Sequence, residues 1–338
     1  MASNLDPRAA VAMLAGLGLL ALVVWLSEPR QTFETLARLA PWQAAVLVAT
    51  SFGVSLFTAL AWHAILRRYG HRVSVWYLFE LTIIAFAAGW AIPSGFVAGI
   101  PLAAWFLRRR GVPFSKGMAS FGISRFLELT AYAGILPVAL LSAVGSRSTV
   151  RVGAAAMLGA MLLAYLDLFL DWRLARRLLR RVGRVSSRLR RPIQAAVAFC
   201  ADVAYFFDGP VGYVLLAAAF SFAAIGMALA RALLASAFLD LGLSTPEVVV
   251  MFAITVLLMA VPFLPGAIGA LEGGIAAAFE MIGRSKADGL AYALSVHAAE
   301  LVVVAAGFAL FGHLGVGHLR SRDRAAASAA ARHAPGRA

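Results

Sequence analysis

The sequence predicts an all-α protein: a polytopic transmembrane helix bundle with inverted repeats and two short helices broken by proline and glycine. Of its 338 residues, 62% are hydrophobic and 14% are charged, and the mean hydropathy is +0.85. A soluble domain cannot bury that much apolar surface, whereas a bilayer covers it. The apolar residues also gather in runs, and most runs approach the roughly 20 residues that a spanning helix needs.

The charges are unbalanced, with 30 Lys and Arg against 16 Asp and Glu and a net charge of +14. In a membrane protein such an excess is expected in cytoplasmic loops. The chain shows no soluble basic domain, so no nucleic-acid partner is expected. The one cysteine, Cys200, leaves no internal disulfide and no cysteine-based metal site.

Two of the apolar runs, 93–107 and 266–282, are short and carry proline and glycine. They fit either tilted short helices or halves of re-entrant hairpins. The first run is followed by Ser27 to Pro29 without a small-x-small cleavage site, which favours a retained first span. The runs are 9–26, 41–66, 73–92, 93–107, 118–144, 152–171, 210–236, 247–264, 266–282 and 289–312.

Basic residues predict the orientation. Arginines follow the runs that end at 66 and 107, nine more lie in 172–191, and the loop 237–247 carries only acids. The positive-inside rule then predicts ten passes, with both short segments crossing. An eight-pass version with re-entrant short segments is disfavoured because it would place Arg108 to Arg110 outside. We expect a multi-pass protein of a bacterial-type inner (plasma) membrane with both termini cytoplasmic.

The predicted organisation is a single transmembrane domain, 1–324, with repeat-like halves at about 41–144 and 210–312. The basic linker 172–209 is expected at the membrane interface, where Arg173 to Arg191 would bind anionic lipid head groups. In the simpler alternative this stretch only determines topology. Residues 325–338, rich in alanine and basic residues, are expected to be a disordered tail.

An internal repeat appears when the second half of the chain is aligned with the first. Each half then reads as a helix, a proline and glycine break, a short helix, and a long helix with a base and an acid three positions apart. Inverted repeats with broken helices are typical of secondary transporters. In one ungapped alignment the matching positions are Pro93 with Pro265, Gly111 with Gly283, Gly117 with Gly289, Arg125 with His297, and Glu128 with Glu300.

Ionisable residues inside the predicted spans are the candidate site. Because charges are costly in hydrocarbon, such groups usually face the bundle interior and pair with one another. They could line a polar path for a charged head group, or they could only lock the bundle. No catalytic residue, cofactor or metal site is predicted, since no metalloprotease, P-loop or nucleophile motif occurs. The predicted substrate path comprises Arg125, Glu128, Glu272, His297, Glu300, Gly266, Gly269, Pro93 and Pro265.

Two stretches carry a resemblance. Leu264 to Gly273 resembles the Pro-Gly-Gly-x-Gly-x-x-Glu signature of the lysylphosphatidylglycerol synthase transmembrane-region proteins, also called flippase-like membrane proteins. Leu107 to Lys116, with the helix that carries Arg125 and Glu128, is similar to that family's loop and its Glu-Arg-x-x-Asp helix. The soluble aminoacyl-transferase domain of the synthases is missing from this sequence. The resemblance therefore implies movement of a lipid and not its synthesis.

The predicted function is transport of an amphiphilic lipid, a phospholipid or a polyprenyl-type lipid, across the inner membrane. The main alternative is an accessory membrane subunit of a lipid-modifying or glycosyltransferase system. An embedded enzyme would need a metal or nucleophile constellation, and a non-catalytic assembly partner would tolerate replacement of the path residues. Membrane lipids are the expected partners; a second copy of the chain and a lipid-modifying enzyme are the protein partners considered.

Overall fold

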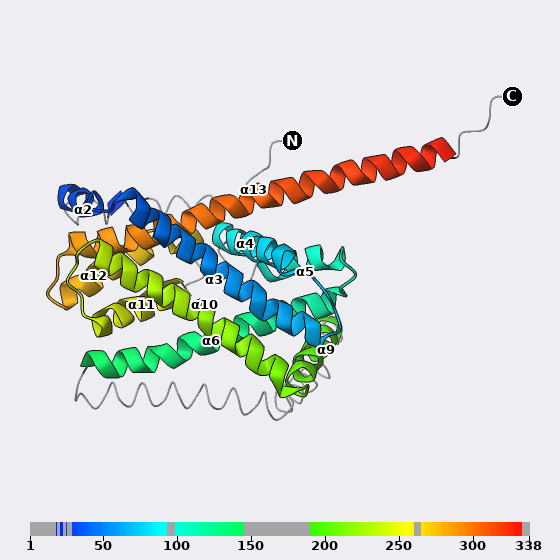
Figure 1. Cartoon of the computed structure of the whole chain (residues 1–338), viewed down its shortest axis with the longest axis horizontal. Coiled ribbons are helices and arrows are strands. Elements are labelled where there is room, and N and C mark those ends of the chain that lie inside the picture. The colour runs from blue at the N-terminus through cyan, green and yellow to red at the C-terminus, as the bar shows by residue number, and fades with distance from the viewer. Residues whose placement is uncertain are drawn as a thin grey trace.

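The computed structural model of the chain describes residues 18, 21, 22, 25, 29–92, 99–144, 190–259 and 265–332. Within these residues every regular element is helical, so the all-α prediction is confirmed there. Three helical segments are long and apolar enough to cross a membrane: Pro41–Arg68, Val211–Phe238 and Lys286–Leu314. The elements, shown in Figure 1, are α2 (Pro29–Leu36), α3 (Pro41–Arg68), α4 (Val75–Ala91), α5 (Gly99–Arg108), α6 (Phe114–Val144), α9 (Arg190–Phe207), α10 (Val211–Phe238), α11 (Thr245–Met259), the 3-10 turn η2 (Pro265–Ala267), α12 (Ala270–Met281) and α13 (Lys286–Arg332).

Helices α3 and α10 have the same length and the same ending. Each has 28 residues, and each starts at a proline or directly after one. At the end of α3 the amide of His71 donates to the Leu66 carbonyl over 2.9 Å, and at the end of α10 the amide of Leu241 donates to Ser236 over 3.1 Å. These 6→1 hydrogen bonds supply donors to carbonyls that otherwise have no hydrogen-bond partner at a helix end. The two helices are thus built alike, although they lie in different halves of the chain.

These two helices pack side by side and run antiparallel through the centre of the bundle (Figure 1). At one end the rings of Trp42 and Phe238 lie 5.4 Å apart. At the other end Arg68 donates to the carbonyl of Tyr205, near the end of α9, the helix that leads into α10, over 3.0 Å. The start of α3 therefore lies beside the end of α10, and the reverse.

Two helical hairpins flank this central pair. In the first, α4 and α5 return to the same end of the bundle, because the Tyr77 hydroxyl donates to the Phe106 carbonyl over 3.2 Å. In the second, α11 and α12 return to the other end, where Arg284 donates to the Gly242 carbonyl over 2.8 Å. The 10 residues of α5 and the 12 of α12 are fewer than a full crossing requires.

The sequence predicts that both short segments cross the membrane, and the described residues give the lengths of their helical parts alone. At about 1.5 Å per residue, α5 and α12 extend about 15 and 18 Å, roughly half of a bilayer core near 30 Å.

The long helices α6 and α13 follow the two hairpins in the same way. A Cβ added to Gly117 at the start of α6 would lie 3.1 Å from the Cα of Ala104 on α5. A Cβ added to Gly289 at the start of α13 would lie 3.0 Å from the Cα of Ala276 on α12. The two glycines match in the alignment of the halves, and so do the two alanines, so glycine allows the same close approach twice. Across the halves, α4 packs on α13 and α11 packs on α6.

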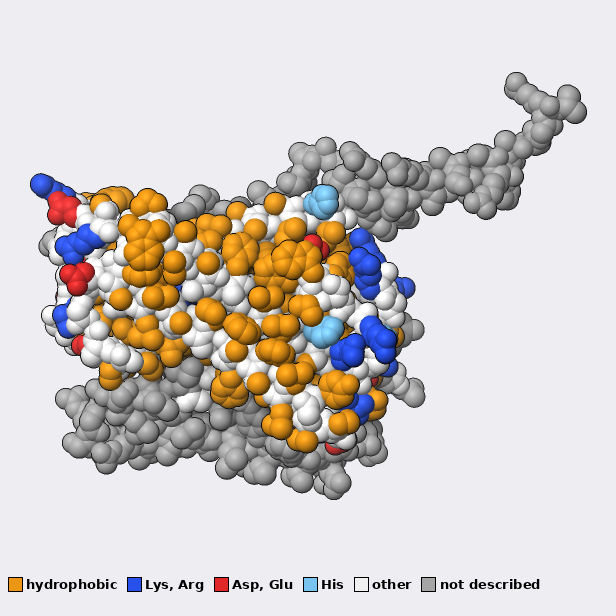
Figure 2. All heavy atoms as spheres, in the orientation of Figure 1, with side chains coloured by type: hydrophobic (Ala, Val, Ile, Leu, Met, Phe, Trp, Pro, Cys, Tyr) orange, Lys and Arg blue, Asp and Glu red, His pale blue; other side chains and the backbone are white. Residues whose placement is uncertain are grey.

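The surface has an apolar belt between two charged ends (Figure 2). Large apolar side chains exposed on the helices include Leu129, Phe222, Leu257 and Phe308. One end of the bundle, where α3 and α5 terminate, carries the exposed basic residues Arg67, Arg72, Arg108, Arg109 and Arg110. The opposite end mixes signs, with the ion pairs Arg30–Glu34 and Lys286–Glu280. This distribution is that of a membrane protein with one strongly basic face.

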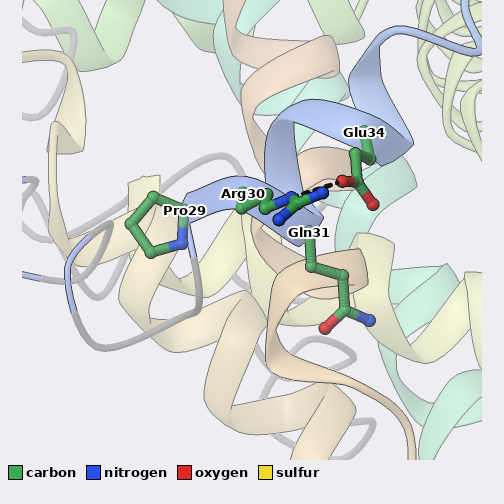
Figure 3. Close-up of a pocket in the computed structure, with 4 residues that line it drawn as sticks. All are labelled: Pro29, Arg30, Gln31 and Glu34. Atoms are coloured by element: carbon green, nitrogen blue, oxygen red, sulfur yellow. Dashed lines mark hydrogen bonds and ion pairs between the residues drawn. The ribbon is translucent and has the colours of Figure 1, made fainter.

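Two peripheral helices close the ends. Helix α2 packs on α13, where the Thr35 hydroxyl donates to Asp288 over 3.0 Å. A shallow depression on α2 is lined by Pro29, Arg30, Gln31 and Glu34 (Figure 3). Helix α9 packs on α6 at the basic end. The structure continues α13 to Arg332, whereas the sequence predicts disorder from 325; an alanine-rich stretch has high helix propensity.

Candidate functional site

The end of α4 meets the break of the second hairpin in the interior of the bundle. Trp90 is 4% exposed and packs against η2. Gly266 has a φ of 59°, and a Cβ at this position would collide with the Trp90 ring. The ring of His297 on α13 lies 4.6 Å from that of Trp90. Two features therefore favour glycine at position 266: the left-handed backbone conformation, and the Trp90 ring, which leaves no space for a Cβ.

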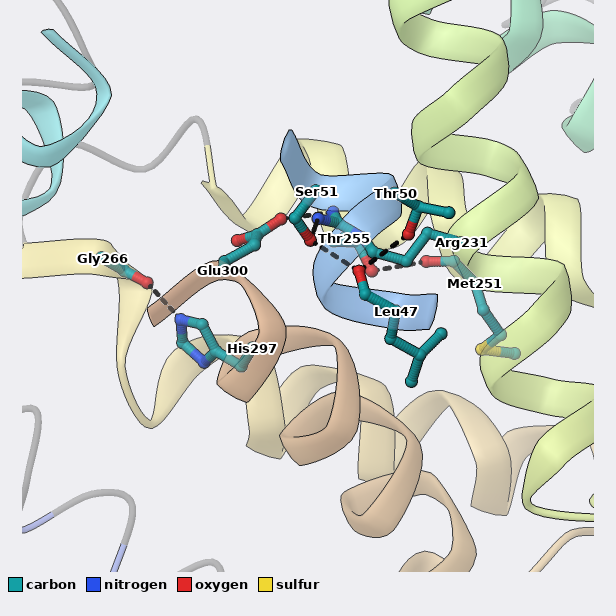
Figure 4. A network of polar contacts seen from close by, with 9 residues as sticks. All are labelled: Leu47, Thr50, Ser51, Arg231, Met251, Thr255, Gly266, His297 and Glu300. Atoms are coloured by element: carbon teal, nitrogen blue, oxygen red, sulfur yellow. Dashed lines mark hydrogen bonds and ion pairs between the residues drawn. The ribbon is translucent and has the colours of Figure 1, made fainter. Parts of the chain in front are cut away.

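Glu272 and His297 form a buried pair at this break. Their exposed fractions are 1% and 3%. Glu272 lies in the first turn of α12 and accepts the Gly269 amide over 2.7 Å, which caps the helix. Its other carboxylate oxygen makes a short hydrogen bond with Nδ1 of His297. The second ring nitrogen, Nε2, lies 3.1 Å from the Gly266 carbonyl oxygen (Figure 4).

A second buried pair lies one helical turn further along α13. Glu300 forms an ion pair with Arg231 of α10, and the same guanidinium donates to the Ser51 hydroxyl of α3 over 2.7 Å (Figure 4). Ser51 in turn donates to the Leu47 carbonyl over 3.0 Å. Arg231 therefore ties three helices together. Its Nε and the second carboxylate oxygen of Glu300 have no hydrogen-bond partner among the described residues.

The third pair belongs to α6. Arg125 and Glu128 are linked over 2.8 Å, and the Thr58 hydroxyl of α3 donates to Glu128 over 2.6 Å. The Glu128 side chain is 8% exposed, whereas that of Arg125 is 30% exposed. The Arg125 Nε has no partner in the described part of the chain. Tyr132, partly buried one turn beyond Glu128, lies near this pair and near Arg231 with Glu300.

These contacts place the predicted residues in one interior region. Arg125, Glu128, Glu272, His297 and Glu300 all take part in ion pairs, each acid with a base, and all of these side chains except that of Arg125 are buried. Gly266 and Gly269 supply the backbone groups, and Pro265 begins η2. Pro93 and the arginines from 173 to 188 lie outside the described residues.

Comparison with known proteins identifies the family. A sequence profile described as "Lysylphosphatidylglycerol synthase TM region" matches residues 13–307. The chain belongs to this family. No curated protein and no solved structure gives a significant match. The suspected relationship is confirmed, and with it a membrane protein of lipid-related function.

Several residues that contribute to the interior of this family member lie outside the predicted substrate path, although the sequence offered Arg231 as a residue that could face the same cavity or extend to the membrane surface. Arg231, Ser51, Thr58, Trp90 and Tyr132 were not among the predicted path residues. Arg231 carried a signal, because an arginine in the middle of the apolar run 210–236 must find a partner. The hydroxyl and aromatic residues carried none, since serine, threonine and tryptophan are common in spans. Among the described residues no group of three His, Cys, Asp or Glu could hold a metal ion.

Proposed function

We propose that this protein is a transporter that moves an amphiphilic lipid, a phospholipid or a polyprenyl-type lipid, between the leaflets of the inner membrane. The observation that carries the proposal is the meeting of the end of α4 with the break before α12, beside buried charge pairs. Non-helical backbone at membrane depth is tolerated only inside protein or beside a water-filled cavity. Such breaks line substrate sites in transporters. The proposal is a transport function and not an enzymatic one.

We infer an inverted repeat, and such a repeat would support alternating access. The order of elements α3 to α6 returns in α10 to α13, with matching residues at the same places in each half. Because α3 and α10 are equivalent and antiparallel, each half is turned over relative to the other. The first hairpin then enters from the basic end and the second from the opposite end. Exchange of conformations between the halves would open a central path first to one leaflet and then to the other.

The half-exposed Arg125 is the proposed head-group anchor. A guanidinium presents a planar fork of donors that matches a phosphate, and it keeps its charge at every physiological pH. Glu128, which accepts the Thr58 hydroxyl, pairs with Nη1 of this arginine, and the arginine side chain remains 30% exposed. The apolar belt around the helices would accept the acyl or prenyl chains while the head group follows the polar interior.

The basic end of the bundle supports the proposed orientation. The arginines after α3 and α5 lie on one end together with Lys116, and positive loops are retained in the cytoplasm. Helix α13 runs from the opposite end to this one. Both termini would therefore be cytoplasmic in an inner membrane, with anionic lipid heads near Arg173 to Arg191.

Native mass spectrometry of the purified protein tests the anchor. The wild type should retain a phosphate-bearing lipid through detergent exchange, and Arg125→Gln should lose most of it. Arg30→Gln is the matched control, because the Arg30 side chain is 93% exposed on α2. Equal retention in both variants would contradict the anchor and would favour the alternative, an accessory subunit whose interior residues are freely replaceable.

A further inference from the structure

The hydrogen bonds of His297 fix the number of protons at the second break. The carbonyl of Gly266 can only accept, so the 3.1 Å contact requires a hydrogen on Nε2. The short contact between Nδ1 and Glu272 requires one more proton between the two atoms. The ring and the carboxylate together therefore hold two protons and carry no net charge, whichever atom owns the shared proton.

Loss of one proton changes the contact with the break. The remaining proton belongs on Nδ1, between the ring and the buried carboxylate, because that hydrogen bond is charge-assisted. Nε2 then presents a lone pair to the Gly266 oxygen, and an attractive contact becomes repulsive. A flip of the His297 imidazole ring does not restore the hydrogen bond to the Gly266 oxygen, because Glu272 would then lose its own donor. The presence or absence of this one proton thus decides whether His297 donates a hydrogen bond to the Gly266 carbonyl.

The held backbone is strained. Gly266 and Ala267 both have positive φ, 59° and 56°. For alanine this left-handed conformation is unfavourable and persists only while its surroundings impose it. Release of the Gly266 carbonyl removes one of those constraints, so the break is the part of the second hairpin that responds first.

The other charges near the pair are already neutralised. Glu300, on α13 itself, is matched by Arg231 of α10. Among the described residues, α12 contributes Glu272 alone, α3 contributes the hydroxyl of Ser51, and α4 contributes the uncharged ring of Trp90. Deprotonation of the pair therefore changes the local net charge from zero to −1, with no second group positioned to absorb the change.

The first half cannot repeat this event. The position equivalent to His297 is Arg125, which stays charged, and the position equivalent to Glu272 is Ile100, which has no carboxylate. One half thus offers a permanent cation and the other offers a site that gains and loses a proton. This difference gives two equivalent hairpins different chemical roles.

We propose that the coupling ion of this transporter is a proton, bound between His297 and Glu272, and that its binding holds the second hairpin closed while its loss releases it. The inference rests on the proposed transport function and specifies its energy coupling. Lipid movement in one direction would then accompany proton movement through the second half alone.

Cysteine labelling tests the latch without any lipid transport. In a Cys200→Ser background, Ala267→Cys places a thiol at the break, and Met281→Cys is an exposed control at 86% exposure. Both proteins are reconstituted in lipid nanodiscs and labelled with N-ethylmaleimide between pH 5.5 and 8.5. The ratio of the two rates removes the intrinsic pH dependence of thiols. It should rise by up to about tenfold per pH unit below its midpoint, as loss of one proton requires.

Two variants decide the cause. His297→Gln and Glu272→Gln each remove one partner of the shared proton, so the pH dependence of their rate ratio should differ from that of the parent protein; unfolding midpoints establish that each is folded. A pH-independent ratio in the parent protein, or an unchanged pH dependence in both variants, would overturn the latch. Either of these labelling results would leave the proposed lipid transport untouched. If labelling depends on pH as expected but lipid is not translocated, the proposed transport function alone is overturned.

Discussion

Removal of Arg231 should destabilise the bundle severely, because it strands a buried carboxylate. The Arg231 and Glu300 side chains are only 9% and 8% exposed, so water does not compensate a lost partner. Breaking such a pair from one side typically costs about 3–5 kcal/mol. Arg231→Met keeps much of the length of the side chain and removes its charge. We expect a loss of free energy of unfolding in that range.

The double variant isolates the interaction. Arg231→Met with Glu300→Leu removes both charges together, and replacement of a buried pair by apolar residues is often neutral or stabilising by about 1–4 kcal/mol. The double variant should therefore be more stable than either single variant. The assay is reversible unfolding in mixed micelles, with the four proteins forming a double-mutant cycle.

Arg30→Met is the matched control for that cycle. It breaks an ion pair whose side chains are 93% and 61% exposed, and such surface pairs contribute about 0–1 kcal/mol. A loss below about 1 kcal/mol for Arg231→Met, similar to the control, would refute the reasoning, because it would mean that water or a lipid head group reaches Glu300.

Two further perturbations test separate parts of the structure. Gly266→Ala should cost about 1–3 kcal/mol more stability than Gly283→Ala, since both positions have positive φ but only the first would collide with a ring, that of Trp90; equal unfolding midpoints would contradict that packing. His71, in the loop after α3, has its pKa lowered by burial and by the nearby Lys116. Since the unfolded state then binds the proton more tightly, His71 contributes stability that is complete above about pH 6.5 and is lost as the pH falls through its lower folded pKa. His71→Gln should flatten this part of the stability profile relative to wild type between pH 7.5 and 5, and identical profiles would count against it.

The location of the charged residues could be predicted from sequence, but not all of their partners. The spacing of Arg125 and Glu128 predicts contact within one helix face, and the structure has that ion pair. The same spacing in His297 and Glu300 does not produce a pair. Each side chain instead contacts another helix, because α12 and α10 supply closer partners. Spacing along one helix contains no information on which other helix packs against it. The partners of His297 and Glu300 therefore could not be predicted from their spacing.

Helix lengths set a similar limit. Proline and glycine in 93–107 and 266–282 predicted interruptions, but the apolar runs extend across the breaks and are equally compatible with full crossings. Composition measures how apolar a segment is, whereas the hairpin geometry depends on contacts at its ends, such as the hydrogen bond from Tyr77 to Phe106. The all-α class followed from composition alone, because only helices satisfy their backbone within each segment in lipid.

Lipid translocation in reconstituted vesicles tests the central claim most directly. Vesicles that carry a fluorescent phospholipid in both leaflets are treated with an impermeant quencher, and the protected fraction is followed with time. In empty vesicles the quencher reaches only the outer leaflet, so about half of the fluorescence stays protected. Vesicles with the wild-type protein and a pH gradient should lose most of this protected half with time, and Arg125→Gln vesicles should keep it as empty vesicles do. The same loss in wild-type and empty vesicles, across phospholipid and polyprenyl-phosphate probes, would contradict the account.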